Sequence, residues 1–167
     1  MEQIAGDLRV FARDLRPSAL DEFGAVVSIK QQLSALRERA VVDTRLVLVG
    51  QERELPAEIR TSIFRIAQEA LRNVERHSRA SRVVVTVIFS ERQIALKIED
   101  NGVGFNVSLS PTDLASNGKL GVLGMFEHAE LLGGRLRHRV EARKRRPGQC
   151  AHTSARPVFV KVATAIL

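Results

Sequence analysis

The sequence predicts an α+β sandwich in which helices cover one face of a mixed sheet. Two kinds of hydrophobic periodicity support this fold class: apolar residues recur at helical spacing in some segments and dominate short strand-like runs in others. The order along the chain is helices, a strand, a long helix, two strands, a loop, a helix and two further strands. Such an order in a chain of 167 residues favours one two-layer domain with a short appendage.

The amino-terminal part of the chain, residues 1–39, is predicted to form two helical stretches. Apolar residues have helical spacing at the start, and Pro17 should break or kink this helix because proline removes a backbone donor and clashes with the preceding turn. The second stretch is expected to run roughly from Leu20 to Arg39.

The remaining elements follow from periodicity and from the residues that bracket each segment. Pro56 near the start and His77 near the end delimit the longest helix, and polar residues between the two central strands indicate a hairpin. A glycine pair stops the last helix. The expected elements are a strand at 44–50, a helix at 56–77, strands at 82–89 and 93–99, a loop at 101–118, a helix at 123–134, and strands at 134–143 and 154–166.

Composition excludes several classes of protein. With 44% hydrophobic and 27% charged residues the chain can build a core, and it has neither an apolar run near the ~20 residues of a membrane span nor a secretion leader. We therefore expect a soluble, cytoplasmic piece with no membrane partner. The single cysteine, Cys150, excludes an internal disulfide and a multi-cysteine metal site.

Positive charge is concentrated at the carboxyl terminus. The formal charge is +7, but residues 135–167 hold nine Lys and Arg against one acid, whereas residues 1–134 hold seventeen basic and eighteen acidic residues. The basic character belongs to the tail and not to the domain, and the chain has no Trp or Tyr. We therefore expect no nucleic-acid partner.

A carboxylate at the end of the second hairpin strand is the first candidate for ligand binding. Side chains alternate along a strand, so Ile94, Leu96, Ile98 and Asp100 share a face that its three apolar members mark as buried. A buried carboxylate without a partner is costly. Either the strand ends early and Asp100 is solvated, or Asp100 faces a ligand that donates hydrogen bonds, such as the exocyclic amine of adenine.

The long helix carries a polar row beside its apolar stripe. Glu69, Asn73 and His77 lie at i, i+4 and i+8 and are expected to stack along one face. Magnesium prefers oxygen ligands and keeps several waters, so one Asn oxygen with phosphate oxygens makes a sensible site. A glutamate one turn away can polarise a nucleophile. Taken alone, the row is more simply a solvated helix face.

Glycines form a third group of candidate residues. Gly102 and Gly104 follow Asp100 and permit close backbone approach to a ligand. Further glycines precede or begin the next helix, where exposed backbone N–H groups and the helix dipole suit phosphates. These are Gly118, Gly121 and Gly124. Each piece alone is a plain turn, but their order after the polar helix favours a nucleotide site.

Several segments resemble a known family. FRIAQEALRNVERHSRAS (64–81), DNGVGF (100–105) and GKLGVLGMFEHAELLGG (118–134) closely resemble the N, G1 and G2 boxes of sensor histidine kinases. LRPSALDEFG (15–24) is similar to the end of the dimerisation helices in the nitrate-sensor-like subgroup. The resemblance covers about residues 8–137 and implies the Bergerat ATP-binding fold shared with gyrase, MutL and the heat-shock chaperone ATPases.

The resemblance implies a role for each candidate residue. Asn73 would bind Mg²⁺, Glu69 would assist the attacking histidine, and Asp100 would read the adenine of ATP. Arg76 or His77 would lie near the phosphates. The glycines would form the floor of the base pocket (Gly102 and Gly104) and the mobile lid over the triphosphate (Gly118, Gly121 and Gly124), and residues 106–117 would complete that lid.

The resemblance also implies that the chain is the catalytic end of a longer protein histidine kinase. Residues 1–39 would be a remnant of the dimerisation and linker helices, and residues 40–167 the ATP-binding domain with a basic, atypical hairpin at 135–167. The phosphoryl group would pass from ATP to a histidine and then to the receiver domain of a response regulator. The parent kinase would be a homodimer, with or without a membrane anchor.

Two features depart from the family pattern. None of the four histidines has the acid directly after it that a phosphoacceptor would have, and none precedes residue 77, so autophosphorylation is not expected. These are His77, His128, His138 and His152. The usual closing GxGT turn is replaced by RRPGQCAHTSARP (145–157), in which Cys150 stands where a second glycine is expected.

Three alternative functions stay open. A serine kinase of the anti-sigma-factor type has the same fold but starts near the ATP-binding domain, so the first forty or so residues argue against it. A nucleotide-gated binding module without turnover is disfavoured by the intact Glu69. A nucleic-acid binder that uses the basic tail would show affinity that falls steeply with salt and ignores Asp100.

Overall fold

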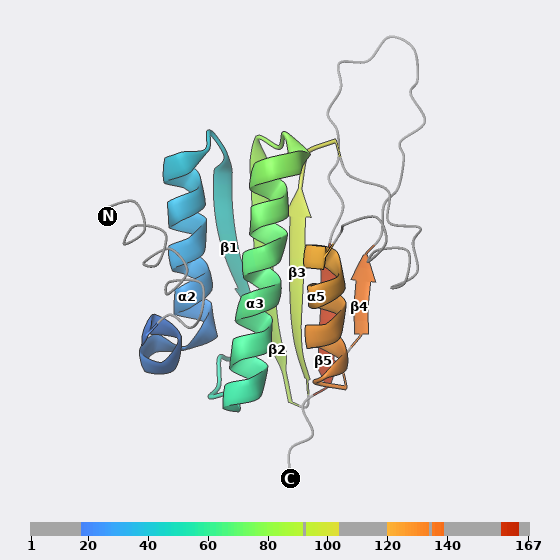
Figure 1. Ribbon diagram of the computed structural model, residues 1–167. Coiled ribbons are helices and arrows are strands. Elements are labelled where there is room, and N and C mark those ends of the chain that lie inside the picture. Colours follow the sequence, from blue (N-terminus) through green and yellow to red (C-terminus); the bar gives the residue numbers. More distant parts are fainter. Residues whose placement is uncertain (1–17, 92, 104–119, 134, 139–157, 164–167) are drawn as a thin grey trace, which may run out of the picture.

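The structure, a computed structural model, consists of a sheet and a layer of helices (Figure 1). It describes residues 18–91, 93–103, 120–133, 135–138 and 158–163. The elements are α2 (Ser18–Arg39), β1 (Asp43–Val49), α3 (Ala57–Asn73), the π-helical turn η1 (Val74–Ser78), β2 (Arg82–Ser90), β3 (Gln93–Asp100), α5 (Leu120–Glu130), β4 (Arg135–His138) and β5 (Val158–Ala163). Their types and order confirm the predicted α+β class.

The sheet is mixed, with the strand order β1-β2-β3-β5-β4. β1 and β2 are parallel, and the other neighbouring strands are antiparallel. Because β1 and β2 are parallel, α3 is the crossover between them and ends beside the start of β2. β3 runs back along β2, so Asp100 at its end pairs with Val83. The ends of α3 and β3 therefore meet at one edge of the sheet.

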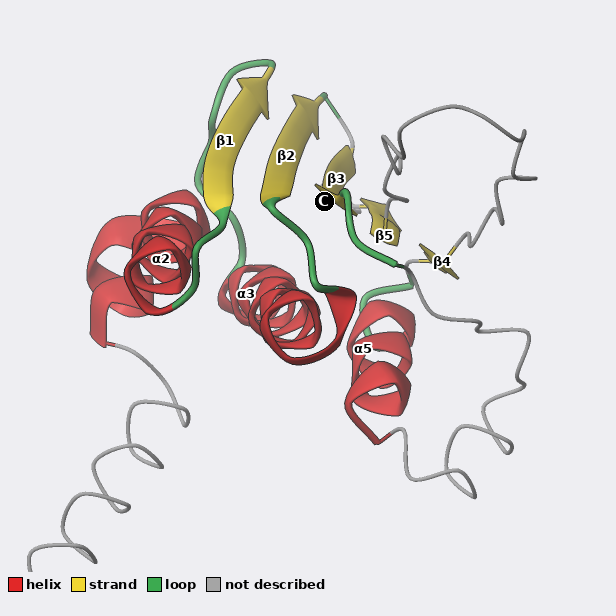
Figure 2. Ribbon diagram, turned by 90° about the horizontal axis from the view of Figure 1, so that it is seen from above, coloured by secondary structure: helices red, strands yellow, loops and turns green. Residues whose placement is uncertain are grey.

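All three helices cover the same face of this sheet (Figure 2). Alternate side chains of β2 and β3 point toward the helices and are at most 6% exposed; they are Val83, Val85, Val87, Phe89, Ile94, Leu96 and Ile98. They belong to one hydrophobic cluster with side chains of α2, α3 and α5. This arrangement confirms the prediction of helices on one face of a mixed sheet.

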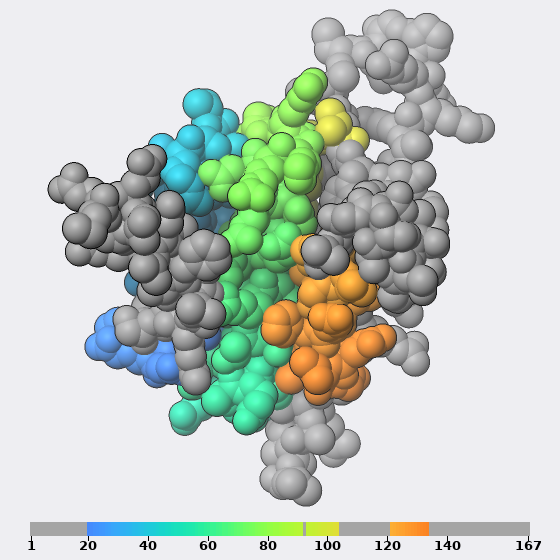
Figure 3. Space-filling model, in the orientation of Figure 1, coloured from blue at the N-terminus to red at the C-terminus, as the bar shows by residue number. Residues whose placement is uncertain are grey.

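Helix α3 is the centre of the helix layer, between α2 and α5 (Figures 1 and 3). Its buried side chains are Ile59, Ser62, Ile63, Phe64, Ile66, Ala67, Ala70 and Leu71. They recur at helical spacing, as the sequence predicts. The helix that carries Glu69 and Asn73 is thus fixed by packing against the sheet and against both neighbouring helices.

One ion pair joins α2 to the start of α3, and another joins α2 to the turn η1 that follows α3. Arg60 Nη2 lies 3.4 Å from Asp21 Oδ1, and Arg39 Nε lies 3.0 Å from Glu75 Oε1. Each pair includes a partly exposed side chain, so each contributes at most about 1 kcal/mol. Apolar packing is the larger contribution, because α2 places Leu20, Ala25, Val26, Ile29, Leu33 and Leu36 in the common core.

The predicted helix at 20–39 is confirmed, but it contains a kink that the sequence analysis missed. Gly24 has φ 82° and ψ 179°, which are not helical values. Glycine tolerates this conformation because it has no Cβ. The division of the chain at residue 40 remains a prediction, since α2 shares its core with α3.

The predicted termination of the last helix by glycine is confirmed, although α5 (Leu120–Glu130) begins three residues and ends four residues earlier than the predicted 123–134. α5 ends at Glu130, and Gly133 follows with φ 61°, as expected of a glycine that terminates a helix. Within the described ranges, no helix is long and apolar enough to cross a membrane.

Two left-handed glycines allow a matched test of packing at the hairpin end of the sheet. Gly50 has φ 84°, and a Cβ there would collide with the Phe89 carbonyl oxygen, whereas a Cβ on Gly133 would meet nothing within 4 Å among the described residues. We expect Gly133→Ala to cost about 1–2 kcal/mol of unfolding free energy through backbone strain alone. Gly50→Ala should cost more, because strain and collision add. Urea unfolding followed by circular dichroism measures both; equal losses would contradict the contact with Phe89.

Candidate nucleotide-binding site

Asp100 lies at the end of the buried face of β3. Ile94, Leu96 and Ile98 are 0%, 1% and 2% exposed, and the strand continues through Asp100. The Asp100 side chain is half-buried. The predicted shared face is confirmed, and the alternative of an early strand end is wrong.

The surroundings of the Asp100 carboxylate have opposing effects on its pKa. Burial raises the pKa above the usual value for aspartate, and this effect is the largest. Hydrogen bonding to Gly102 N, 2.9 Å from Asp100 Oδ1, and to the amide of Asp100 itself lowers it, and the nearby Ser78 side chain acts in the same direction. The net direction is upward, so desolvation outweighs these bonds. A ligand that donates a hydrogen bond here would offset part of the desolvation.

The loop after β3 lies against the turn that follows α3. Val103 N donates to Ser78 O at 2.7 Å. Gly102 lies so close that a Cβ on it would collide with the same carbonyl oxygen. The close approach predicted for Gly102 is therefore present toward Ser78, while its approach to a ligand stays a prediction. Gly104 lies outside the described residues.

Ser78 is a site residue that the sequence analysis missed. It is 8% exposed, its Oγ donates to Val74 O at 2.8 Å, and the same Oγ accepts from Ala80 N at 3.0 Å. Serine hydroxyls commonly bond to nearby backbone groups, including the carbonyl four residues earlier, and are favoured in turns. Its position directly after the predicted helix was the available clue, but its closeness to Asp100 depends on tertiary structure.

Asn73 and Glu69 lie in the last two turns of α3. Asn73 Nδ2 is buried and has no hydrogen-bond partner within the described part of the chain. An unpaired buried amide is costly, so a polar ligand beside it would be favoured. Glu69 is half-buried, with Oε2 3.6 Å from Arg72 Nη1.

A magnesium site here would depend on few protein ligands. No group of three or more His, Cys, Asp or Glu side chains that could hold a metal occurs among the residues that the structure describes. The residues fit magnesium only in the manner expected from the sequence, with the amide of Asn73 and oxygens of the ligand itself. Magnesium commonly binds in this way, because it retains several waters and uses substrate phosphates.

The predicted row of Glu69, Asn73 and His77 runs through two kinds of helix. The α-helix ends at Asn73, and the next five residues, His77 among them, form a π-helical turn, so the regular α-helical spacing stops before the third member of the row. Glu69 and Asn73 are half-buried, whereas Arg76 and His77 are exposed. The wider turn buries Ser78 instead, which packs beside the loop after β3.

The structure places Gly121 and Gly124 inside α5 and not in a loop. A Cβ on Gly121 would collide with the Glu69 carboxylate, so this glycine lets α5 pack directly against Glu69. A Cβ on Gly124 would meet nothing within 4 Å in the part of the chain that the structure describes. A lid role for these glycines stays a prediction. Gly118 and residues 106–117 lie outside the described residues.

Comparison with known proteins places this geometry in a family. Residues 58–157 match the family described as histidine kinase-, DNA gyrase B-, and HSP90-like ATPase. The signal transduction histidine-protein kinase/phosphatase DegS of Brevibacillus brevis is 29% identical over 130 residues, 78% of this chain and 32% of DegS. The sensor histidine kinase LiaS of Bacillus subtilis is 32% identical over 138 residues, 80% of this chain and 36% of LiaS. The chain spans about a third of the length of these curated relatives.

Solved structures share the fold at low sequence identity. The histidine kinase domain of the Erythrobacter litoralis EL346 blue-light activated kinase has a TM-score of 0.62 and 18% identity, over 85% of this chain and 62% of that chain. The Acinetobacter baumannii histidine kinase AdeS has a TM-score of 0.62 and 18% identity, over 85% of this chain and 64% of that chain. The likeness agrees with the one-sided helix layer described above. Because the family match covers more than half of its residues, this chain belongs to the histidine kinase-, DNA gyrase B- and HSP90-like ATPase family.

Proposed function

We propose that this chain is the ATP-binding catalytic domain of a two-component sensor histidine kinase. The observation that carries the proposal is the half-buried Asp100 carboxylate, held at the edge of the sheet where α3 and β3 end. Family membership supports ATP as the ligand, and the sensor kinases among the relatives support phosphoryl transfer to histidine. These relatives do not favour the alternative of a serine kinase.

Asp100 is proposed to read the adenine base. Its carboxylate would accept a hydrogen bond from the exocyclic amine, which relieves part of the desolvation that raises the pKa of Asp100. Gly102 supports the site by packing on the Ser78 carbonyl without a side chain between them. Gly104 is proposed to complete the floor of the base pocket.

The end of α3 is proposed to bind the phosphates. Asn73 would hold Mg²⁺ together with oxygens of the ligand, and magnesium supplies neutralisation of phosphate charge when bound. Glu69, oriented by its ion pair with Arg72, would polarise the attacking nucleophile. Arg76 and His77 would place positive charge near the phosphates from the turn after Asn73. The glycines of α5 and the segment before it are proposed to close over the triphosphate.

The phosphoryl acceptor is proposed to be a histidine outside this chain. The four histidines of this sequence lack a following acid, and the chain spans only about a third of its relatives. Residues 1–39 are proposed to continue into a dimerisation helix of a homodimeric parent. A receiver domain of a response regulator would take the phosphoryl group from that histidine.

The Asp100→Asn substitution tests the adenine contact. The amide replaces one acceptor oxygen by a donor, so the adenine amine loses its partner. A mismatched buried polar contact costs about 1–3 kcal/mol, which is about 5- to 150-fold in the dissociation constant of Mg-ATP. Calorimetric titration measures the loss. The matched control is Glu99→Gln, which neutralises the neighbouring carboxylate, paired with Lys97 at 2.8 Å. Equal affinities of native chain and Asp100→Asn, or no binding by either, would contradict the proposal.

The same substitution is expected to preserve or raise stability at neutral pH. Because the pKa of Asp100 is raised in the folded state, the folded chain binds a proton more readily than the unfolded chain. Ionised Asp100 therefore reduces stability as pH rises from the ordinary aspartate pKa through the raised one. Asp100→Asn removes this cost at pH 7, and the difference should shrink toward pH 4. Thermal unfolding at pH 7 and at pH 4 checks this expectation. A variant that is less stable than the native chain at pH 7 but not at pH 4 would refute it.

Asn73→Ala is expected to remove the contribution of magnesium to binding. The native chain should bind ATP more tightly in Mg²⁺ than in EDTA, and loss of a ligand side chain should reduce that gain by at least about tenfold. Affinity in EDTA should change little, because the base contacts of Asp100 persist. Calorimetry in both buffers separates the contribution of Mg²⁺ to binding from that of the base contacts. An equal loss in EDTA and in Mg²⁺ would show that Asn73 does not act through the metal.

A further inference from the structure

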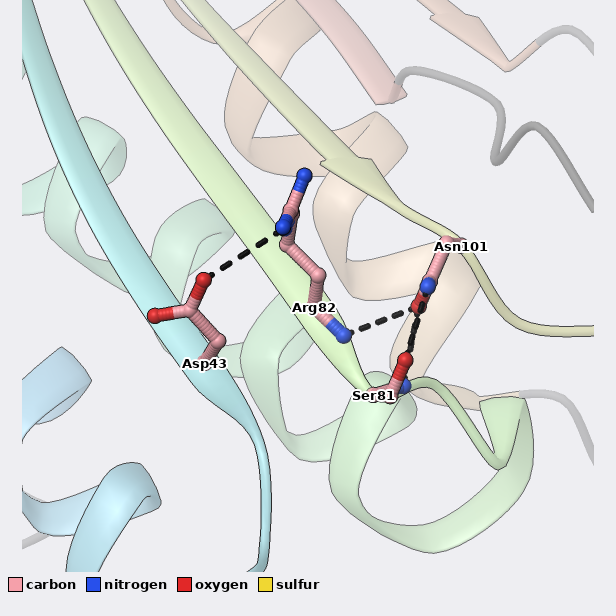
Figure 4. A network of polar contacts seen from close by, with 4 residues as sticks. All are labelled: Asp43, Ser81, Arg82 and Asn101. Atoms are coloured by element: carbon pink, nitrogen blue, oxygen red, sulfur yellow. Dashed lines mark hydrogen bonds and ion pairs between the residues drawn. The ribbon is translucent and has the colours of Figure 1, made fainter. Parts of the chain in front are cut away.

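The side chain of Asn101 joins the loop after β3 to the start of β2 (Figure 4). Asn101 Oδ1 accepts from both Ser81 N and Arg82 N at 2.8 Å, and Asn101 Nδ2 donates to Ser81 Oγ at 2.8 Å. Asn101 N donates to Arg82 O at 3.1 Å. We call these four bonds the Asn101 clasp. It joins Asn101 to two residues that are far from it in the sequence and come shortly after the turn that follows α3.

The partners of the clasp are themselves anchored. Asp43 N at the start of β1 donates to Ser81 O at 2.9 Å, and Asp43 Oδ2 lies 3.4 Å from Arg82 Nε. The ion pair is exposed and contributes little, but the backbone bond ties the corner to the parallel strand pair. The clasp therefore fastens Asn101 to a fixed point of the sheet.

Asn101 is bracketed by two residues of the proposed base pocket. Asp100 precedes it, and Gly102, whose amide donates to the Asp100 carboxylate, follows it. A shift of Asn101 would move both neighbours, because consecutive Cα atoms lie about 3.8 Å apart with fixed peptide geometry. The Oδ1 atom of Asn101 already accepts two bonds, so it is occupied within the protein.

We propose that Asn101 is a positioning residue for nucleotide selectivity: the clasp holds the Asp100 carboxylate where it distinguishes a 6-amino purine from a 6-oxo purine. This inference rests on the proposed function of Asp100 as the adenine reader. Discrimination by a buried hydrogen-bonding group requires a fixed geometry, since a group that can move accommodates the wrong ligand. Without the clasp, the carboxylate would keep its chemistry and lose its placement.

The test compares ATP with inosine triphosphate, which carries an oxo group in place of the amine. The ratio of their dissociation constants is measured by calorimetry on the whole chain with Mg²⁺. Asn101→Ala should raise the dissociation constant of ATP about tenfold, which corresponds to one hydrogen bond of about 1.4 kcal/mol. It should change the dissociation constant of inosine triphosphate by less than about twofold. The preference for ATP thus falls about tenfold. Circular dichroism melting reports the folded fraction independently.

Two conservative variants and a control at a distant position are measured in the same way as Asn101→Ala. Asn101→Asp keeps an oxygen for both amides, and the Ser81 hydroxyl can rotate to donate to it, so the preference for ATP should persist. Asn101→Ser retains a shorter acceptor, should be intermediate, and serves if Asn101→Ala does not fold. Ser90→Ala removes the bond from Ser90 Oγ to Gln93 O at the far end of the same strands and should leave the ratio unchanged.

The outcomes are distinguishable. A reduced preference in Asn101→Ala that Asn101→Asp restores supports the inference. An unchanged preference in Asn101→Ala and Asn101→Ser, or equal weakening of both nucleotides, overturns it and leaves Asp100 as the adenine reader. If the native chain binds both nucleotides equally, adenine reading itself is refuted, and the inference falls with it.

Discussion

The site depends on one constraint: a carboxylate occupies the last position of an otherwise apolar face of the sheet. Ile94, Leu96 and Ile98 are almost fully buried, and the alternation of β3 carries Asp100 into the same environment. Desolvation of Asp100 is unfavourable in the absence of a strong donor. Gly102, which donates to it, and Ser78 offset only part of this cost. The fold thus retains a destabilising group at the end of β3, where the proposed adenine contact would relieve part of its cost.

Connectivity brings the other half of the site to this carboxylate. The parallel pairing of β1 and β2 makes α3 a crossover helix, so its last turn returns to the edge where β2 begins. The antiparallel β3 ends at the same edge. Asn73 and Asp100 therefore lie toward the same end of the sheet because of the order of the strands, and packing of α3 between two helices fixes the position of that helix.

The elements were predictable because their determinants are local. Helical spacing identified α3, apolar runs identified β2 and β3, and counting along β3 placed Asp100 on the buried face. The π-helical turn was not predictable, because it accompanies the packing of Ser78 against Gly102 from a distant part of the chain. The same applies to the contact of Gly121 with Glu69. Within the site, residue types were visible in the sequence, and partners were not.

The hairpin register also determines where the chain tolerates changes of length. The turn between Ser90 and Gln93 lies at the end of β2 and β3 opposite to Asp100. Residues added there lengthen both strands or the turn. Asp100 stays on the same face of the sheet, because its pairing with Val83 is unchanged. A single residue inserted between Ile98 and Asp100 would turn the carboxylate to the outer face. Reporter domains or natural insertions are thus compatible with the hairpin tip, whereas a one-residue insertion in β3 just before Asp100 is not.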